Sequence, residues 1–85
     1  METTFENGTL ITSYSACGQI EEFDMTSDSM EDTIRAWSYL IGTGTCWSLQ
    51  GSYGRAASSL IDKDVISEKG VVNWELIHLN QYNNE

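Results

Sequence analysis

Polar and apolar residues alternate over residues 9–16, as they do in a half-buried strand. The positions that share one face are Leu10, Thr12 and Tyr14. Cys17-Gly18 then supplies a turn, and residues 19–26, with Ile20 and Phe23 as apolar positions, predict a second strand. The pattern therefore predicts an antiparallel hairpin in the first third of the chain.

Asn7-Gly8 is a stronger short turn signal than Cys17-Gly18. It predicts a hairpin in which a short strand over residues 3–5 pairs with the strand at 9–16. The two hairpins are compatible, because the strand at 9–16 has two edges. Both turns therefore stay open as predictions.

Two helices follow in the pattern. Asp28-Ser29-Met30-Glu31 has capping-box spacing, and the apolar residues after it recur every three or four positions, at Met30, Ile34, Trp37 and Ile41. Gly42 and Gly44 end this helix, which we predict over 29–41. Residues 52–62 predict a second helix, whose inner side holds Tyr53, Ala56, Ala57, Leu60 and Ile61.

The remaining segments predict turns and extended chain. Residues 45–50 read as a short strand or an extended connector, and 67–70 as a tight turn with Gly last. Residues 71–79 alternate in the manner of a strand, and 80–85 form a polar tail that we expect to fray. The predicted fold class is α+β: one domain over 1–85, with two helices on one face of an antiparallel sheet of three or four strands.

The net charge of the chain limits the classes of binding partner that are plausible. The 85 residues hold 13 acidic and four basic side chains, for a formal net charge of −9. Proteins bind nucleic acids and anionic membranes through Lys and Arg side chains, so we expect this acidic chain to bind neither directly. No apolar run approaches the ~20 residues that span a bilayer. A basic protein surface is the partner that this charge attracts.

Candidate chemistry is sparse. His78 is the only imidazole, and no spacing suggests a triad with Cys17, Cys46 or a serine. The two cysteines lack the paired spacing of a zinc site, and Gly42-Thr43-Gly44 lacks the Gly-Lys-Ser/Thr of a phosphate loop. We expect no enzyme activity, no metal and no cofactor. The N-terminal residues carry no secretory pattern, so we expect a cytoplasmic protein with reduced thiols.

Two features are candidates for partner binding. Six carboxylates fall within twelve residues that contain no base, and they are Glu21, Glu22, Asp24, Asp28, Glu31 and Asp32. They form either an anionic docking face or a solvated strand edge followed by a helix N-terminus. Tyr39 and Trp47 lie in an uncharged stretch, where an exposed aromatic side chain would serve as an interface anchor.

The acidic run EEFDMTSDSMED at residues 21–32 and the segment GSYGRAASSLIDKDVISEKGVVNWELI at 51–77 resemble small phage-encoded inhibitor proteins. That class includes DNA mimics, anti-CRISPR proteins and blockers of host nucleases or RNA polymerase. The resemblance implies a stoichiometric inhibitor without catalysis.

The leading hypothesis is a non-catalytic protein that blocks a basic, nucleic-acid-handling surface of a larger host protein. One alternative is a homo-oligomeric structural or regulatory module, with a homodimer as its smallest form. A second alternative is an oligomer that sequesters a small nucleotide, using Arg35, Arg55 and nearby aromatic residues.

Overall fold

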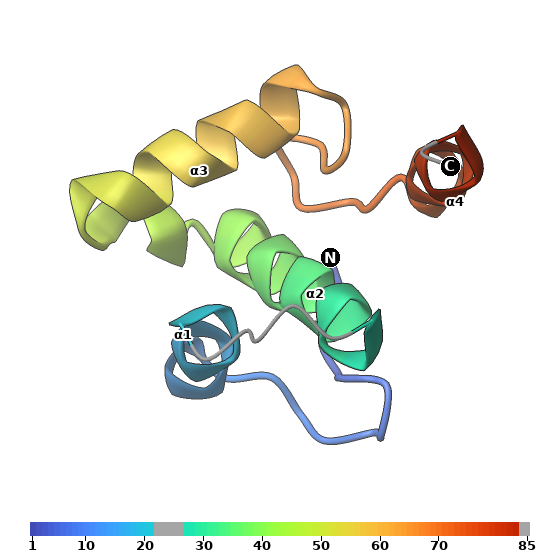
Figure 1. Cartoon of the computed structure of the whole chain (residues 1–85). Helices are drawn as coiled ribbons and strands as arrows, with labels where there is room; N and C mark the ends of the chain where they lie inside the picture. Colours follow the sequence, from blue (N-terminus) through green and yellow to red (C-terminus); the bar gives the residue numbers. More distant parts are fainter. Residues whose placement is uncertain (22–26, 84–85) are drawn as a thin grey trace.

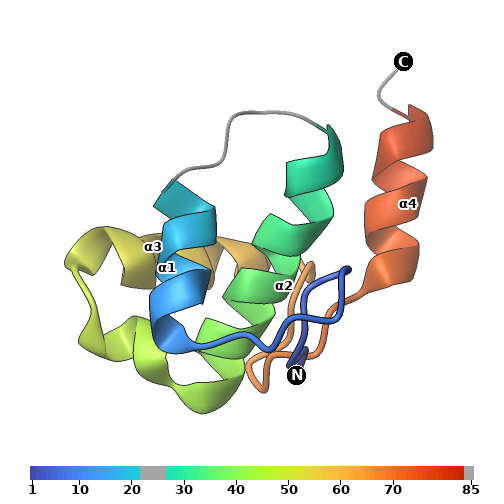
Figure 2. The same cartoon turned by 90° about the horizontal axis from the view of Figure 1, so that it is seen from below.

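The computed structural model describes residues 1–21 and 27–83, and side chains over 1–21 and 30–78. These residues form α1 (Ser13–Glu21), α2 (Ser27–Thr43), the 3₁₀ helix η1 (Thr45–Ser48), α3 (Gly51–Asp62) and α4 (Trp74–Asn83). Helices α1 and α3 lie on either side of α2, and α4 stands at the N-terminal end of α2 (Figures 1 and 2). The part of the chain described here is helical.

The predicted α+β class is wrong. Among the described residues, extended pairing is limited to two isolated antiparallel bridges, Thr4 with Leu10 and Ile66 with Val72. No strand or sheet forms within residues 1–21 and 27–83. The helices instead bury their apolar side chains against one another. The core residues are Ile11, Ala16, Ala36, Leu40, Ile41, Cys46, Ala57 and Ile66.

Helix α1 replaces the predicted strand over 9–16 and places Cys17-Gly18 inside a helix rather than in a turn. Thr12 caps it: the Ser15 backbone N–H donates to Thr12 Oγ1 at 3.0 Å, and the Thr12 N–H donates to Ser15 Oγ at 2.8 Å. This reciprocal pair works as a capping box with Ser in the third position. Of the residues predicted to share one strand face, Leu10 is 70% and Tyr14 90% exposed, whereas Ala16 faces the core. The strand predicted over 19–26 is wrong at residues 19–21, and residues 22–26 lie outside the description.

The turn at Asn7-Gly8 is confirmed. Gly8 has a φ of 88°, and Asn7 Oδ1 accepts a hydrogen bond from the Thr9 N–H at 2.9 Å. The hairpin that this turn begins is short, because pairing goes no further than the bridge of Thr4 with Leu10 and the Ile11 N–H bond to the Thr3 carbonyl at 2.9 Å. The segment then turns into α1.

Both predicted central helices are confirmed: α2 is longer than predicted by two residues at each end, and α3 by one residue at its N-terminal end. In α2, Ala36 and Leu40 are fully buried and Ile41 nearly so, while Trp37 packs half-buried against the core. Helix α3 turns Ala57 inward as expected. Residues 45–48 form η1 rather than the predicted short strand or extended connector, and Cys46 is the buried residue of this helix.

The turn at 67–70 is confirmed, and it packs directly on α2. Gly70 has a φ of 86°, and its N–H donates to the Ser67 carbonyl at 2.9 Å. Buried Ser38 donates its Oγ hydrogen to the Gly70 carbonyl and accepts from the Glu2 N–H at 2.8 Å. One serine of α2 therefore holds both the N-terminal segment and the turn before α4.

The strand predicted over 71–79 is wrong from residue 74, where α4 begins. Asn73 caps this helix, because its Oδ1 accepts from the Leu76 N–H at 3.1 Å. Ile77 is turned inward and is 7% exposed. Residues 80–83 of the predicted tail belong to α4, and 84–85 lie outside the description.

Candidate protein-binding surface

The acidic run predicted as a docking face is divided by the structure. Glu21 ends α1 and accepts a hydrogen bond from the Tyr53 hydroxyl of α3 at 2.5 Å. Glu31 and Asp32 lie on α2, where Glu31 faces α4 and Asp32 faces the N-terminal segment. Asp28 lies in α2 beyond the described side chains, and Glu22 and Asp24 lie outside the described residues. Of the described members, the structure brings together Glu31 and Asp32 and separates Glu21 from them.

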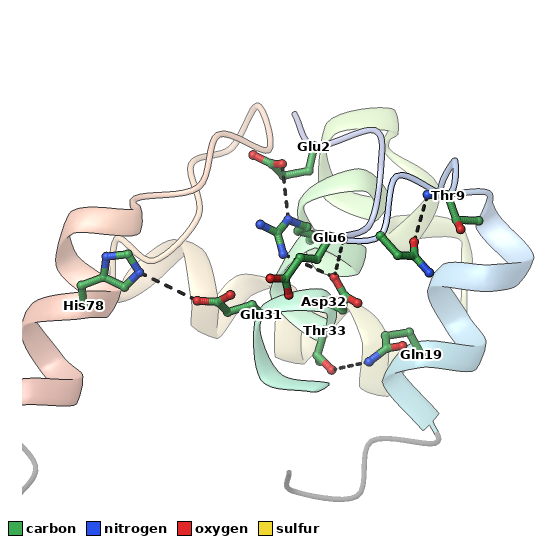
Figure 3. A network of polar contacts seen from close by, with 10 residues as sticks. Glu2, Glu6, Thr9, Gln19, Glu31, Asp32, Thr33 and His78 are labelled. Atoms are coloured by element: carbon green, nitrogen blue, oxygen red, sulfur yellow. Dashed lines mark hydrogen bonds and ion pairs between the residues drawn. The ribbon is translucent and has the colours of Figure 1, made fainter. Parts of the chain in front are cut away.

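Arg35 is the centre of a polar cluster that joins three segments, and Figure 3 shows its acidic neighbours Glu2, Glu6, Glu31 and Asp32. Its Nη1 lies 3.3 Å from Asp32 Oδ1 and its Nε 3.8 Å from Glu2 Oε1. Its guanidinium carbon stands 5.1 Å from the centre of a Trp74 ring, a cation–π distance. The side chain is 20% exposed, so water screens these contacts less than on an open surface. One cation thus connects the N-terminal segment, α2 and α4.

Asp32 has a second partner in the N-terminal segment. Its Oδ1 accepts a hydrogen bond from the Glu6 N–H at 2.9 Å, besides the contact with Arg35. An ionised acceptor makes a stronger bond than a neutral one. The carboxylate therefore fixes the Glu6 backbone beside α2, and Figure 3 shows the Glu6 side chain on this side of the molecule.

Glu31 connects α2 to α4 at the edge of the cluster. Its Oε2 lies 3.9 Å from His78 Nε2, a contact that becomes an ion pair when His78 is protonated. The His78 ring stacks at a tilt 6.3 Å from Trp74. The contacts of His78 are therefore with Glu31 and Trp74.

These groups form one acidic face, which we define by the carboxylates of Glu2, Glu6, Glu31 and Asp32 around Arg35. Glu2 and Asp32 are paired with the guanidinium, so four negative charges stand against one positive charge and the face keeps a surplus of three while His78 is neutral. Sequence reasoning missed Glu2 and Glu6, since only tertiary structure places them beside α2. It also missed Arg35 as the common partner of Glu2 and Asp32.

The two aromatic candidates lie away from this face. Tyr39 is half-buried and packs against the core. Trp47 is 51% exposed and lies in η1, after the C-terminal end of α2, whereas the acidic face is at the N-terminal half. Trp47 borders a groove along α3 with Gly51, Gly54 and Arg55. The structure therefore does not bring the aromatic candidates together with the acids.

A pocket of about 290 Å³ opens between α1, α2 and α3. Its lining residues are Ile20, Glu21, Trp37, Ser52, Tyr53 and Ala56. The rings of Trp37 and Tyr53 are 5.6 Å apart at an angle of 48°. Burial, followed by the hydrogen bond to Glu21, raises the pKa of the Tyr53 phenol, which therefore stays a donor at neutral pH. The apolar pattern placed Trp37 and Tyr53 on the inner faces of two helices and gave no sign of a pocket.

Other chemical groups are few in the described part of the chain. Cys17 and Cys46 are free thiols, and burial raises the pKa of Cys46. Residues 1–21 and 27–83 present no group of three His, Cys, Asp or Glu side chains that could hold a metal. The same residues contain no helix long and apolar enough to cross a membrane.

Comparison with known proteins identifies the family. The model of the domain of unknown function DUF7417 matches residues 19–81. No curated protein and no solved structure matches the chain. The matched range includes Arg35, Trp74 and His78 and excludes Glu2 and Glu6. Since it covers most of the 85 residues, the chain belongs to the DUF7417 family.

Proposed function

We propose that this protein is a non-catalytic binding protein whose acidic face docks on a basic surface of a larger protein. The observation that carries the proposal is the surplus of carboxylates near Arg35: Glu2, Glu6, Glu31 and Asp32 come from two separate segments, and of these four Glu2 and Asp32 are paired with its guanidinium. Arg35 holds the carboxylates of Glu2 and Asp32 together across two segments, which supports a binding role.

The fold also holds the face in a defined shape before any partner arrives. Arg35 and the Asp32 bond to Glu6 restrain two of the carboxylates, so less conformational entropy is lost on binding. Charge-assisted hydrogen bonds to Arg or Lys of the partner supply affinity, and the net charge of −9 speeds the encounter.

The partner class follows from the same chemistry. A protein surface that recognises nucleic acid is built to accept about one negative charge per 1.7 Å of duplex axis, and clustered carboxylates replace some of those phosphates. We propose a host nuclease, CRISPR effector or RNA polymerase as the partner, in the host cytoplasm. The likeness of the acidic run to phage-encoded inhibitors supports this choice.

A pair of matched variants tests the proposal. Glu6→Gln with Glu31→Gln removes two charges from the acidic face, and Asp62→Asn with Glu68→Gln removes two exposed charges elsewhere. Immobilised wild-type protein should retain a host protein at 50 mM salt, release it at 500 mM salt, and release it when duplex DNA is added. The control variant should behave like the wild type, and the acidic-face variant should lose most of the retained protein.

Three results would count against the proposal. Equal retention by both variants would show that the acidic face is not the contact. If duplex DNA does not reduce retention, the surface of the partner that binds this protein is not its nucleic-acid-binding surface. A stable dimer in sedimentation that the acidic-face variant converts to monomer would favour the homo-oligomer instead. A nucleotide bound through Arg35 would first have to displace its two carboxylate partners.

A further inference from the structure

The pocket between α1, α2 and α3 lies on the other side of α2 from the acidic face. Trp37 of the pocket and Arg35 of the face are two residues apart, which places them about 200° apart around the helix. The acidic face therefore does not use this pocket, and its chemistry is a separate question.

The walls of the pocket are apolar and aromatic. Ile20, Trp37 and Ala56 are half-buried, and the tilted rings of Trp37 and Tyr53 form two adjacent walls. An aromatic ring attracts cations through the negative charge of its π face. With its volume of about 290 Å³, the pocket is at the lower limit of ligand sites and fits a small head group.

Glu21 is the one charged side chain among the described lining residues. The Tyr53 hydroxyl donates to its Oε2 at 2.5 Å and so orients the carboxylate at the rim. No described Lys, Arg or His forms an ion pair with Glu21. The negative charge of the carboxylate is thus available to a cation that enters the pocket.

We propose that this pocket binds an alkylated ammonium group, such as the trimethylammonium of choline or of trimethyl-lysine. The methyl groups contact Ile20 and Ala56, the cation lies against the Trp37 and Tyr53 rings, and Glu21 neutralises its charge. A phosphate or carboxylate ligand is repelled by the same residue. An uncharged ligand of equal shape keeps only the apolar contacts.

Choline and 3,3-dimethylbutan-1-ol test this directly, because they share a shape and differ in charge. The probe is the indole N–H signal of Trp37 in nuclear magnetic resonance spectra of the full chain, assigned by its loss in Trp37→Phe. Choline should shift this signal with saturation at millimolar concentration, and the neutral alcohol should bind at least tenfold more weakly. Equal binding of the two, or no shift with choline, would overturn the proposal without any variant.

Two variants test whether the carboxylate of Glu21 contributes to choline binding. Glu21→Gln should weaken choline binding at least fivefold, whereas Glu68→Gln, which removes one exposed charge elsewhere, should leave it unchanged. Unchanged binding by Glu21→Gln would refute the role of this carboxylate. The acidic-face variant Glu6→Gln with Glu31→Gln should bind choline normally, so the two proposals fail or hold independently.

The source of the head group is distinguished by three probes. Free choline, a peptide with trimethyl-lysine, and phosphatidylcholine vesicles present the same cation on different carriers. If the peptide shifts the Trp37 signal at a tenfold lower concentration than choline does, the ligand is a methylated protein. Vesicle binding that choline competes would assign a lipid head group.

Discussion

Gly70→Ala is the substitution whose cost the structure predicts most directly. Gly70 has a φ of 86°, in the left-handed region that side chains other than Gly rarely adopt. A Cβ there would lie 2.6 Å from the Ser38 carbonyl oxygen and 2.8 Å from the Gly42 Cα. Both contacts are with the backbone of α2, which cannot move aside as a flexible side chain does.

The magnitude has two parts. Left-handed backbone costs an alanine about 1–2 kcal/mol, and forcing a methyl group into a packed contact costs about 1–3 kcal/mol more. Gly70→Ala should therefore lower the free energy of unfolding by about 2–5 kcal/mol. A domain of this length has a total of about 4–13 kcal/mol. The variant should consequently be close to unfolding.

Gly8→Ala is the matched control. Gly8 has nearly the same φ, 88°, but nothing lies within 4 Å of the added Cβ. Gly8→Ala should lower the free energy of unfolding only by the cost of the left-handed backbone, about 1–2 kcal/mol. Urea unfolding followed by circular dichroism measures both free energies. If Gly70→Ala is no less stable than Gly8→Ala, the 67–70 turn does not pack closely enough on α2 to exclude a Cβ, and the reasoning is refuted.

Two further predictions concern charged and titratable groups. Arg35→Gln leaves two carboxylates without their shared cation, so it should lower the free energy of unfolding by about 1–3 kcal/mol and speed hydrogen exchange in α4. Lys69→Gln removes an exposed cation and should change neither quantity. Equal exchange rates in the two variants would contradict the role of Arg35. Burial raises the pKa of Cys46 above its ordinary 9.0, and that of Tyr53 above 10.0. The unfolded chain therefore loses these protons first, and the free energy of unfolding should fall as pH rises above about 9. Urea midpoints from pH 8 to 11 measure this, and a flat profile would refute it.

Much of the local structure could be predicted where the signals are short-range. The helices α2 and α3 follow from repeated apolar spacing over more than ten residues, which a strand cannot use. The turns at Asn7-Gly8 and 67–70 follow from Gly at positions of positive φ. In each case neighbouring residues alone decide the conformation.

Helices α1 and α4 were predicted as strands because they are short and alternate in polarity. Over nine or ten residues, a period of two and a period of 3.6 fit almost equally well. The deciding contacts are the caps, where Thr12 pairs with Ser15 and Asn73 binds the Leu76 N–H. Among the described side chains of α4, Ile77 is the one that is buried.

By itself, the sequence determined the net charge, the acid-rich run and the two central helices, since these depend on composition and on neighbours in the chain. Only the tertiary structure decided which acids act together. It turned Glu21 toward Tyr53 and gathered Glu2 and Glu6 beside Asp32. The physical reason is that the direction of a side chain depends on the helix that carries it and on what that helix packs against, and both are long-range properties.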